Sequence, residues 1–321
     1  MLSSFLQSKL NLLIYQRLGW RIALHYITFL GGLYFFFKRK EKRKIKNAIH
    51  SVFREKRNAD MPSIRSNVFR GIILHYYEKL FNAFSSAETL KSFLKTHIES
   101  EDMTSIKRGL SKGKGVLLIT AHFGGVEFIP GYLAANDYPV TILVRFSSNH
   151  LRNISLQKAE KFSTKIIDVE NTPNIMKEIF NNLKENRIVI TQCDEIDEWR
   201  PSRHQSDFFL GKHINCDRTM NILMRRTNAP IVFGLMQRDP HCRYKFVATS
   251  LEEIAKQYPP CDIRATGGVA LKFLEDFIYK NPEQWYQWKK YANMETIPPH
   301  SIEVEGATFP LMLKPSLSKA S

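Results

Sequence analysis

The feature that most constrains this fold is a regular alternation that begins at Gly113, where short apolar runs are separated by helix-like segments. Such alternation is typical of an α/β domain built around a largely buried sheet. The expected strands are VLLITAH (116–122), VTILVR (140–145), KIIDV (165–169), RIVITQC (187–193), PIVFGLM (230–236) and YKFVATS (244–250). The expected helices cover about 126–136, 149–162, 173–186, 217–228 and 262–280.

The residues before and after this α/β region show different sequence patterns. Residues 62–110 are expected to be mostly helical, because apolar residues such as Val68, Ile72 and Leu80 recur at helical spacing, and Ser86 is expected to begin a second helix. After Tyr291 the periodicity fades. We therefore divide the chain into an N-terminal apolar and basic segment (1–61), an α/β domain (62–291) and a C-terminal tail (292–321) that is irregular.

The N-terminal segment combines an aromatic-rich stretch with a basic run. Residues 18–37 are apolar but interrupted by Arg21 and His25, and the uninterrupted part, 26–37, is shorter than the roughly 20 residues that span a bilayer. Residues 38–46 (KRKEKRKIK) carry seven cations. This pattern favours a helical segment that associates with an anionic membrane surface. The alternatives are a buried helix followed by a solvated basic face, and a nucleic-acid patch, which the neighbouring aromatic residues disfavour.

The overall charge limits the classes of partner. The chain has 47 Lys and Arg against 31 Asp and Glu, a net charge of +16, which indicates a polyanionic partner: nucleic acid, an anionic membrane or a phosphorylated substrate. Its four cysteines are widely spaced, without a C-x-x-C pair. A disulfide framework or a zinc site is therefore not expected.

The strongest candidate site is the segment GKGVLLITAHFGGVEFIPGYL (113–133), in which a strand leads into His122 and Glu127 follows across a strand-to-helix turn. A neutral imidazole can take the proton of an attacking hydroxyl, and a carboxylate on its other nitrogen fixes the tautomer. Gly124 and Gly125 allow the backbone to pass close to a substrate. The same pattern also fits a strand-end histidine that only makes hydrogen bonds within the fold.

Several segments, in order, resemble the bacterial lipid A biosynthesis acyltransferases, the lauroyl and myristoyl transferases of the lysophospholipid acyltransferase superfamily. The similarity runs over roughly residues 15–291. The matching segments are GGLYFFFKRKEKRKIKNAIHSVF (31–53), GKGVLLITAHFGGVE (113–127), TQCDEID (191–197), FFLGKHINCDRTMNILMRRTNAPIVFGLMQRD (208–239) and PEQWYQWKKY (282–291).

The resemblance implies a glycerolipid-acyltransferase-like α/β fold, a central mixed sheet flanked by helices. It also implies that His122 is the general base and Glu127 its orienting carboxylate. The acyl donor would be acyl carrier protein or acyl-CoA, the acceptor a membrane glycolipid, and no metal or other cofactor would be needed. The implied location is the cytoplasmic face of the bacterial inner membrane. Nucleic acid is not an expected partner.

Three further residues are predicted to contact substrate. By the resemblance, Asp194 matches an acidic position at the end of a central strand, although it also fits a solvent-facing loop acid. Val169 stands where the family usually has an arginine, so the basic contact to donor or acceptor is either missing or supplied by Arg145 or Arg152, which also fit simple surface charges.

The departures from the family pattern leave other functions open. The acceptor could be a different glycolipid or a phospholipid, as for a lysophospholipid or glycerolipid acyltransferase. The same scaffold could serve a non-catalytic protein of anionic membranes, or a hydrolase that uses the same pair of residues to activate water.

Overall fold

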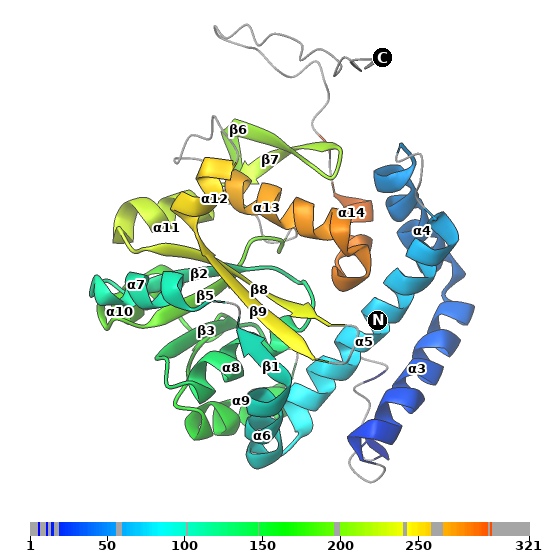
Figure 1. Cartoon of the computed structure of the whole chain (residues 1–321), viewed down its shortest axis with the longest axis horizontal. Helices are drawn as coiled ribbons and strands as arrows, with labels where there is room; N and C mark the ends of the chain where they lie inside the picture. The colour runs from blue at the N-terminus through cyan, green and yellow to red at the C-terminus, as the bar shows by residue number, and fades with distance from the viewer. Residues whose placement is uncertain are drawn as a thin grey trace, which may run out of the picture.

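The computed structural model describes Leu6, Asn11, Ile14 and Tyr15, and then residues 19–55, 60–100, 102–146, 148–195, 200–239, 243–257, 266–294 and 296. Within them, seven strands form one sheet in the order β1-β9-β8-β2-β5-β3-β4 (Figure 1). The strands β8, β2, β5, β3 and β4 run parallel, whereas β9 is antiparallel to β8 and parallel to β1. Their bounds are Ile98–Ser100 (β1), Val116–Thr120 (β2), Val140–Val144 (β3), Lys165–Asp168 (β4), Ile188–Gln192 (β5), Ile231–Arg238 (β8) and Tyr244–Ser250 (β9).

Helices cover both faces of this sheet, which explains why its strands read as continuous apolar runs. Leu117 and Ile119 of β2 face a core shared with α10 (Ile175–Lys184) and α13 (Thr266–Lys280). Val116 and Leu118, which alternate with them, face a second core that is shared with α6 (Ala87–His97), α7 (Thr104–Ser111) and α8 (Ile129–Ala135). Figure 1 shows the sheet between these layers.

The remaining elements complete the two layers and the connections. They are α9 (Asn149–Lys161), α11 (Thr219–Thr227), α12 (Leu251–Gln257), α14 (Trp288–Asn293), the 3₁₀ helices η1 (Val126–Phe128) and η4 (Pro282–Gln284), and the antiparallel hairpin β6 (Pro201–Phe209) and β7 (Lys212–Asp217).

The structure confirms the predicted mixed α/β architecture and each of the six predicted strands. The predicted helices are present as η1 with α8, and as α9, α10, α11 and α13. Ser86 caps α6 as predicted, because its hydroxyl accepts a hydrogen bond from the Thr89 amide. The strand β1 and the β6–β7 hairpin were not predicted.

The N-terminal elements pack on the α/β domain through α5 (Met61–Phe84). The helix α3 (Trp20–Phe37) lies against α5, where Gly31 meets Ile73 and the rings of Phe35 and Phe69 pack edge to face. The helix α4 (Arg39–Phe53) packs on α14. No helix in the described part of the chain is both long enough and apolar enough to cross a bilayer. The predicted tail, 292–321, lies almost entirely outside the described residues.

Candidate active site

The sheet topology brings two residues of the sequence motifs together. The strands β2 and β5 are parallel neighbours, with Thr120 beside Gln192, and the Cys193 amide continues the ladder by donating to the Thr120 carbonyl. His122 and Asp194 each follow two residues after these paired positions. They therefore meet at the carboxyl edge of the sheet, where α/β proteins commonly bind their ligands.

Asp194 holds the inner nitrogen of His122. The distance from His122 Nδ1 to Asp194 Oδ1 is 2.9 Å, and the His122 amide also donates to the carboxylate at 3.0 Å. The indole of Trp285 donates to Oδ2 at 2.8 Å, and the Asp194 side chain is fully buried. Because an ionised carboxylate only accepts hydrogen bonds, Nδ1 carries a proton and Nε2 is the nitrogen that can exchange one.

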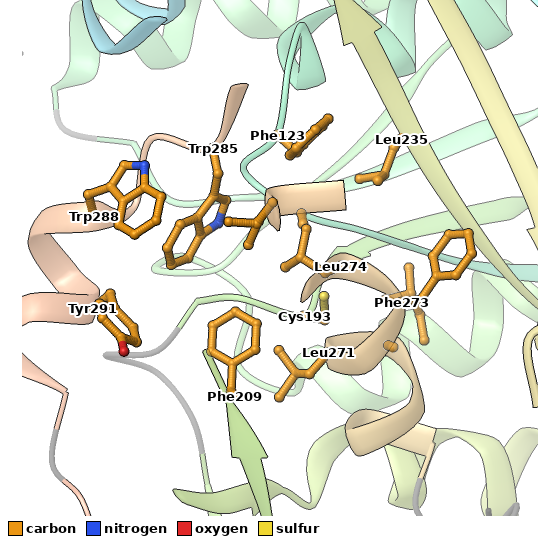
Figure 2. Close-up of a cluster of buried hydrophobic side chains, with 14 of the residues drawn as sticks. Phe123, Cys193, Phe209, Leu235, Leu271, Phe273, Leu274, Trp285, Trp288 and Tyr291 are labelled. Carbon is orange, nitrogen blue, oxygen red and sulfur yellow. The ribbon is translucent and has the colours of Figure 1, made fainter. Parts of the chain in front are cut away.

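Trp285, which binds Asp194 together with His122, belongs to a buried aromatic cluster. Figure 2 shows Trp285 between Phe123, Trp288 and Phe209, and the Trp285 side chain is fully buried. The Gly124 amide donates to the carbonyl of Gln284 at 2.8 Å, which attaches the chain after His122 to the segment that carries this tryptophan. The orientation of Asp194 is therefore fixed by packing from a distant part of the sequence.

The outer nitrogen of His122 is covered by Glu195. His122 Nε2 lies 2.8 Å from Glu195 Oε1, and Lys290 Nζ donates to Glu195 Oε2 at 2.7 Å. Burial lowers the pKa of His122, but Asp194 and Glu195 outweigh this effect and raise it to about 9. For Glu195 burial acts in the opposite direction and raises the pKa. His122 and Lys290 outweigh this effect and lower the pKa of Glu195 to about 2. Both shifts favour the ion pair of a protonated His122 and an ionised Glu195.

Glu127 lies in a different part of the site from the one predicted. It is on η1, and its Oε1 is 4.0 Å from His75 Nε2 and 3.9 Å from Lys79 Nζ, both on α5. Among the described contacts, none joins Glu127 to His122, and Asp194 occupies the nitrogen that was assigned to Glu127. The catalytic role of Glu127 stays a prediction.

His75 and Tyr286 connect Glu127 with His122 and were missed in the sequence. The ring of His75 stacks on Tyr286 with centroids 3.3 Å apart, and Tyr286 meets the His122 ring edge to face at 5.0 Å. Burial, assisted by Lys79 and Arg238, lowers the pKa of His75 well below its usual value, so its imidazole is neutral. Within the part of the chain that the structure describes, its Nδ1 has no hydrogen-bond partner. The only sequence signal was that Tyr286 lies in the PEQWYQWKKY segment, as does Lys290.

The two glycines serve close packing between elements. Gly124 has a φ of 57°, and a Cβ there would collide with the Met236 carbonyl of β8. The Gly125 amide donates to that same carbonyl at 2.9 Å, and a Cβ on Gly125 would meet the ring of Tyr244 at 2.7 Å. These contacts hold the turn after His122 against β8. Whether either glycine also contacts substrate stays a prediction.

The predicted arginines are near the same edge of the sheet, but they lie beside β3 and β4, which are farther from His122 than β5 is. Arg145 directly follows β3, and Arg152 on α9 donates to Asp168 at the end of β4 at 2.6 Å. The order β2-β5-β3-β4 separates β4 from β2 by two strands. The structure therefore does not bring Arg152 to the His122–Asp194 pair, and a substrate contact of either arginine stays a prediction.

A buried ion pair fastens α5 to the sheet beneath the site. Arg238 of β8 donates to both oxygens of Glu78, at 2.6 and 2.9 Å, and to the Gly124 carbonyl at 3.0 Å. The Tyr244 hydroxyl donates to Glu78 at 2.8 Å. The Glu78 side chain is fully buried and that of Arg238 nearly so, which ties the glycine turn to α5 through one network.

A histidine whose inner nitrogen is held by a buried carboxylate, at the carboxyl edge of an α/β sheet, is an arrangement chemically suited to taking a proton from a hydroxyl group. In the described ranges, no group of three or more His, Cys, Asp or Glu side chains is placed to share a metal ion.

The chain as a whole identifies the family. Residues 9–290 match the family model of bacterial lipid A biosynthesis acyltransferase, and the chain belongs to that family. This confirms the resemblance in the sequence motifs. Membership indicates an acyltransferase of lipid A biosynthesis, with an acyl donor and a lipid acceptor as its substrates. Comparison with curated proteins gave no match.

Proposed function

We propose that this protein transfers a fatty acyl chain from a thioester of acyl carrier protein or coenzyme A to a hydroxyl of a membrane glycolipid, with His122 as the general base. The observation that carries the proposal is the 2.9 Å contact between His122 Nδ1 and the buried Asp194. It directs Nε2 toward the less buried side of the site, where the partly exposed Glu195 lies. The family supports acyl transfer as the reaction.

In this mechanism the acceptor hydroxyl takes the place of Glu195 Oε1 at Nε2. Neutral His122 removes the hydroxyl proton while the oxygen attacks the thioester carbonyl. The tetrahedral intermediate collapses to the ester, the carbon–sulfur bond breaks, and the imidazolium returns the proton to the thiolate. Asp194 stabilises the imidazolium between these steps.

Glu195 and Lys290 suggest where the reacting carbonyl lies. In the resting site the Glu195 carboxylate has one oxygen on His122 Nε2 and the other on Lys290 Nζ. In the proposed mechanism the reacting substrates take the place of the Glu195 carboxylate. The attacking hydroxyl oxygen then lies at His122 Nε2, and the carbonyl oxygen of the thioester lies at the Lys290 ammonium. Lys290 is then positioned to stabilise the oxyanion.

A direct test uses purified protein in detergent with radiolabelled acyl thioesters of both carriers and a total polar lipid extract. Label that appears in one glycolipid supports the proposal and identifies the acceptor. Label in a phospholipid, the product of acylating a lysophospholipid, would replace the glycolipid with a glycerolipid acceptor. No transfer from either thioester would rule out the proposed reaction.

We expect Asp194→Asn to lower the pKa of His122 by about one unit or more, and Glu127→Gln to leave it nearly unchanged. Asp194 raises the pKa of His122 against the effect of burial, so its removal leaves only Glu195 to oppose burial. NMR titration of the His122 ring measures both variants. A larger shift from Glu127→Gln than from Asp194→Asn would mean that Glu127 is the orienting carboxylate in solution.

Replacing Glu195 by Gln is expected to move the acidic limb of the kcat/KM pH profile to lower pH by about one unit. Only neutral His122 can act as the base, and Glu195 favours the protonated form. Removing this carboxylate therefore leaves more neutral imidazole at a given pH.

The matched control is Glu185→Gln, because Glu185 is exposed and pairs with Lys165 away from His122. Lys290→Met, measured in the same assay, should lower kcat as expected for an oxyanion donor. An acidic limb that stays in place in Glu195→Gln would show that Glu195 does not control the base.

We also propose that the protein acts at the cytoplasmic face of the inner membrane and associates with the bilayer through α3. Family membership supports membrane association, since enzymes of lipid A biosynthesis act on membrane lipids. Large apolar side chains on one side of α3 are exposed to solvent, and Phe29 and Phe37 are 65 and 71% exposed. Such a surface is typical of an interfacial helix. The members of this apolar stripe are Ile22, Phe29, Leu33, Phe36 and Phe37.

A further inference from the structure

A cationic hollow lies beside the apolar stripe, where the end of α3, one face of α4 and the start of α5 meet. Its volume is about 400 Å³. On α4, four of its cations occur at intervals of three, one and three residues, so they lie on one helical face. The cations lining it are Arg39, Lys42, Arg43, Lys46 and Arg65, and its other residues are Phe35, Phe36 and Asn47.

The charge of this hollow is not compensated within the described part of the protein. None of its five cations forms an ion pair with a described carboxylate. Glu41, the acid of α4, is instead bound by the Tyr34 hydroxyl at 3.1 Å and by Lys289 at 2.9 Å. Five converging like charges repel one another, so the hollow is suited to an anion with several acceptor oxygens.

The hydrogen-bond donors and aromatic rings of the hollow also fit an anion with several acceptor oxygens. The Nε of Arg65 is buried and has no hydrogen-bond partner among the described residues, which is unusual because buried donors are normally paired. Arg39 lies over the ring of Phe36 at 5.5 Å, and Lys42 lies over the ring of Phe69 at 5.8 Å. These aromatic contacts order the cations and leave their charge available to an acceptor.

The exposed stripe of α3 indicates the rest of the ligand. Phe36 belongs both to the stripe and to the wall of the hollow, and it is 57% exposed. A ligand in the hollow is therefore adjacent to side chains that favour the acyl boundary of a membrane. A free anion or an acidic protein would account for the cations but would leave these exposed rings unexplained.

We infer that the cationic hollow binds the phosphate headgroup of an anionic membrane lipid while the apolar stripe of α3 enters the acyl boundary beside it. This inference rests on the membrane association in the proposed function and is independent of the acyl-transfer chemistry. It assigns four of the six Lys and Arg residues of α4 to a defined pocket rather than to a diffuse attraction.

The test compares two triple variants that each remove three positive charges from the full-length protein. Lys42→Gln/Lys46→Gln/Arg65→Gln alters the hollow. The control, Lys107→Gln/Lys112→Gln/Lys114→Gln, alters exposed lysines in and after α7, away from α3 and α4 (Figure 1). Co-sedimentation without acyl donor measures partitioning onto phosphatidylcholine vesicles that contain phosphatidylglycerol. We expect a loss of about tenfold or more for the hollow variant and less than about threefold for the control.

Two further vesicle and anion measurements identify the ligand. Vesicles that contain oleate at the same surface potential should bind the wild type more weakly than phosphatidylglycerol vesicles, because a carboxylate offers fewer acceptors than a phosphate. Inorganic phosphate should displace the protein from phosphatidylglycerol vesicles only weakly, because it lacks the acyl chains that the apolar stripe contacts.

Several results would overturn the inference. Equal losses in the two triple variants would indicate diffuse attraction, and equal binding to oleate vesicles would remove the phosphate site. Strong competition by inorganic phosphate would indicate a free anion as the ligand. Loss of acyl carrier protein binding with intact vesicle binding would assign the hollow to an acidic protein. Circular dichroism and thermal unfolding show whether each variant folds. A failure of acyl transfer would be seen in the transfer assay and not in these measurements.

Discussion

Replacing His122 by Ala is expected to lower kcat/KM for acyl transfer by about 10²–10⁴-fold, because a positioned general base contributes an effect of this size. The structure provides one imidazole on Asp194 and no second imidazole at that position among the described residues. His75 is nearby, but its ring is stacked against Tyr286. Transfer of a labelled acyl chain at acceptor concentrations well below KM measures the effect.

The control for this substitution is His97→Ala, since His97 ends α6 and is exposed. It should retain activity within about twofold, as expected of a surface substitution away from the site. His122→Ala must also keep its thermal unfolding midpoint, which separates lost chemistry from lost folding. If folded His122→Ala retained wild-type activity, His122 would not be the base.

Replacing Arg238 by Met is expected to lower the free energy of unfolding by about 3–5 kcal/mol, because it leaves the Glu78 carboxylate buried without its charged partner. The same change also removes the hydrogen bond to Gly124. Urea unfolding at neutral pH, followed by circular dichroism, measures the loss. The double variant Glu78→Gln/Arg238→Met should recover part of it, since no unpaired charge then remains.

An exposed pair on the same sheet provides the control. Arg243 lies 3.2 Å from Glu99, and both side chains are mostly exposed. Arg243→Met should therefore change the free energy of unfolding by at most about 1 kcal/mol. Similar losses for Arg238→Met and Arg243→Met would show that burial does not govern the strength of the Glu78–Arg238 pair.

The sequence predicted the sheet well because its strands are buried on both faces. Such strands appear as continuous apolar runs, and all six of those predicted are present. The strand β1 has only three residues, Ile98–Ser100, and no apolar run of its own. The β6–β7 hairpin was also missed, because most of β6 (PSRHQSD, 201–207) contains no apolar run.

The contacts of the site were harder to predict, because they depend on which strands are neighbours. His122 and Asp194 are 72 residues apart and meet only because β5 pairs with β2. Glu127 is close to His122 in sequence, but the 3₁₀ turn of η1 directs it toward His75. Spacing along the chain predicted His122 as the candidate base and could not decide which carboxylate holds it.

Trp285 is also separated from the acid it binds by 91 residues, and this distance has a consequence for biosynthesis. A ribosome adds about 5–20 residues per second. His122 and Asp194 are therefore translated several seconds before the indole that fixes Asp194 and the lysine that binds Glu195. The nascent chain consequently lacks the complete network around His122 and Asp194 until α14 has emerged. Under the proposed mechanism, acyl-transfer competence should arise only after synthesis has passed α14, so a chain that stops earlier would be inactive even though it contains the complete histidine motif.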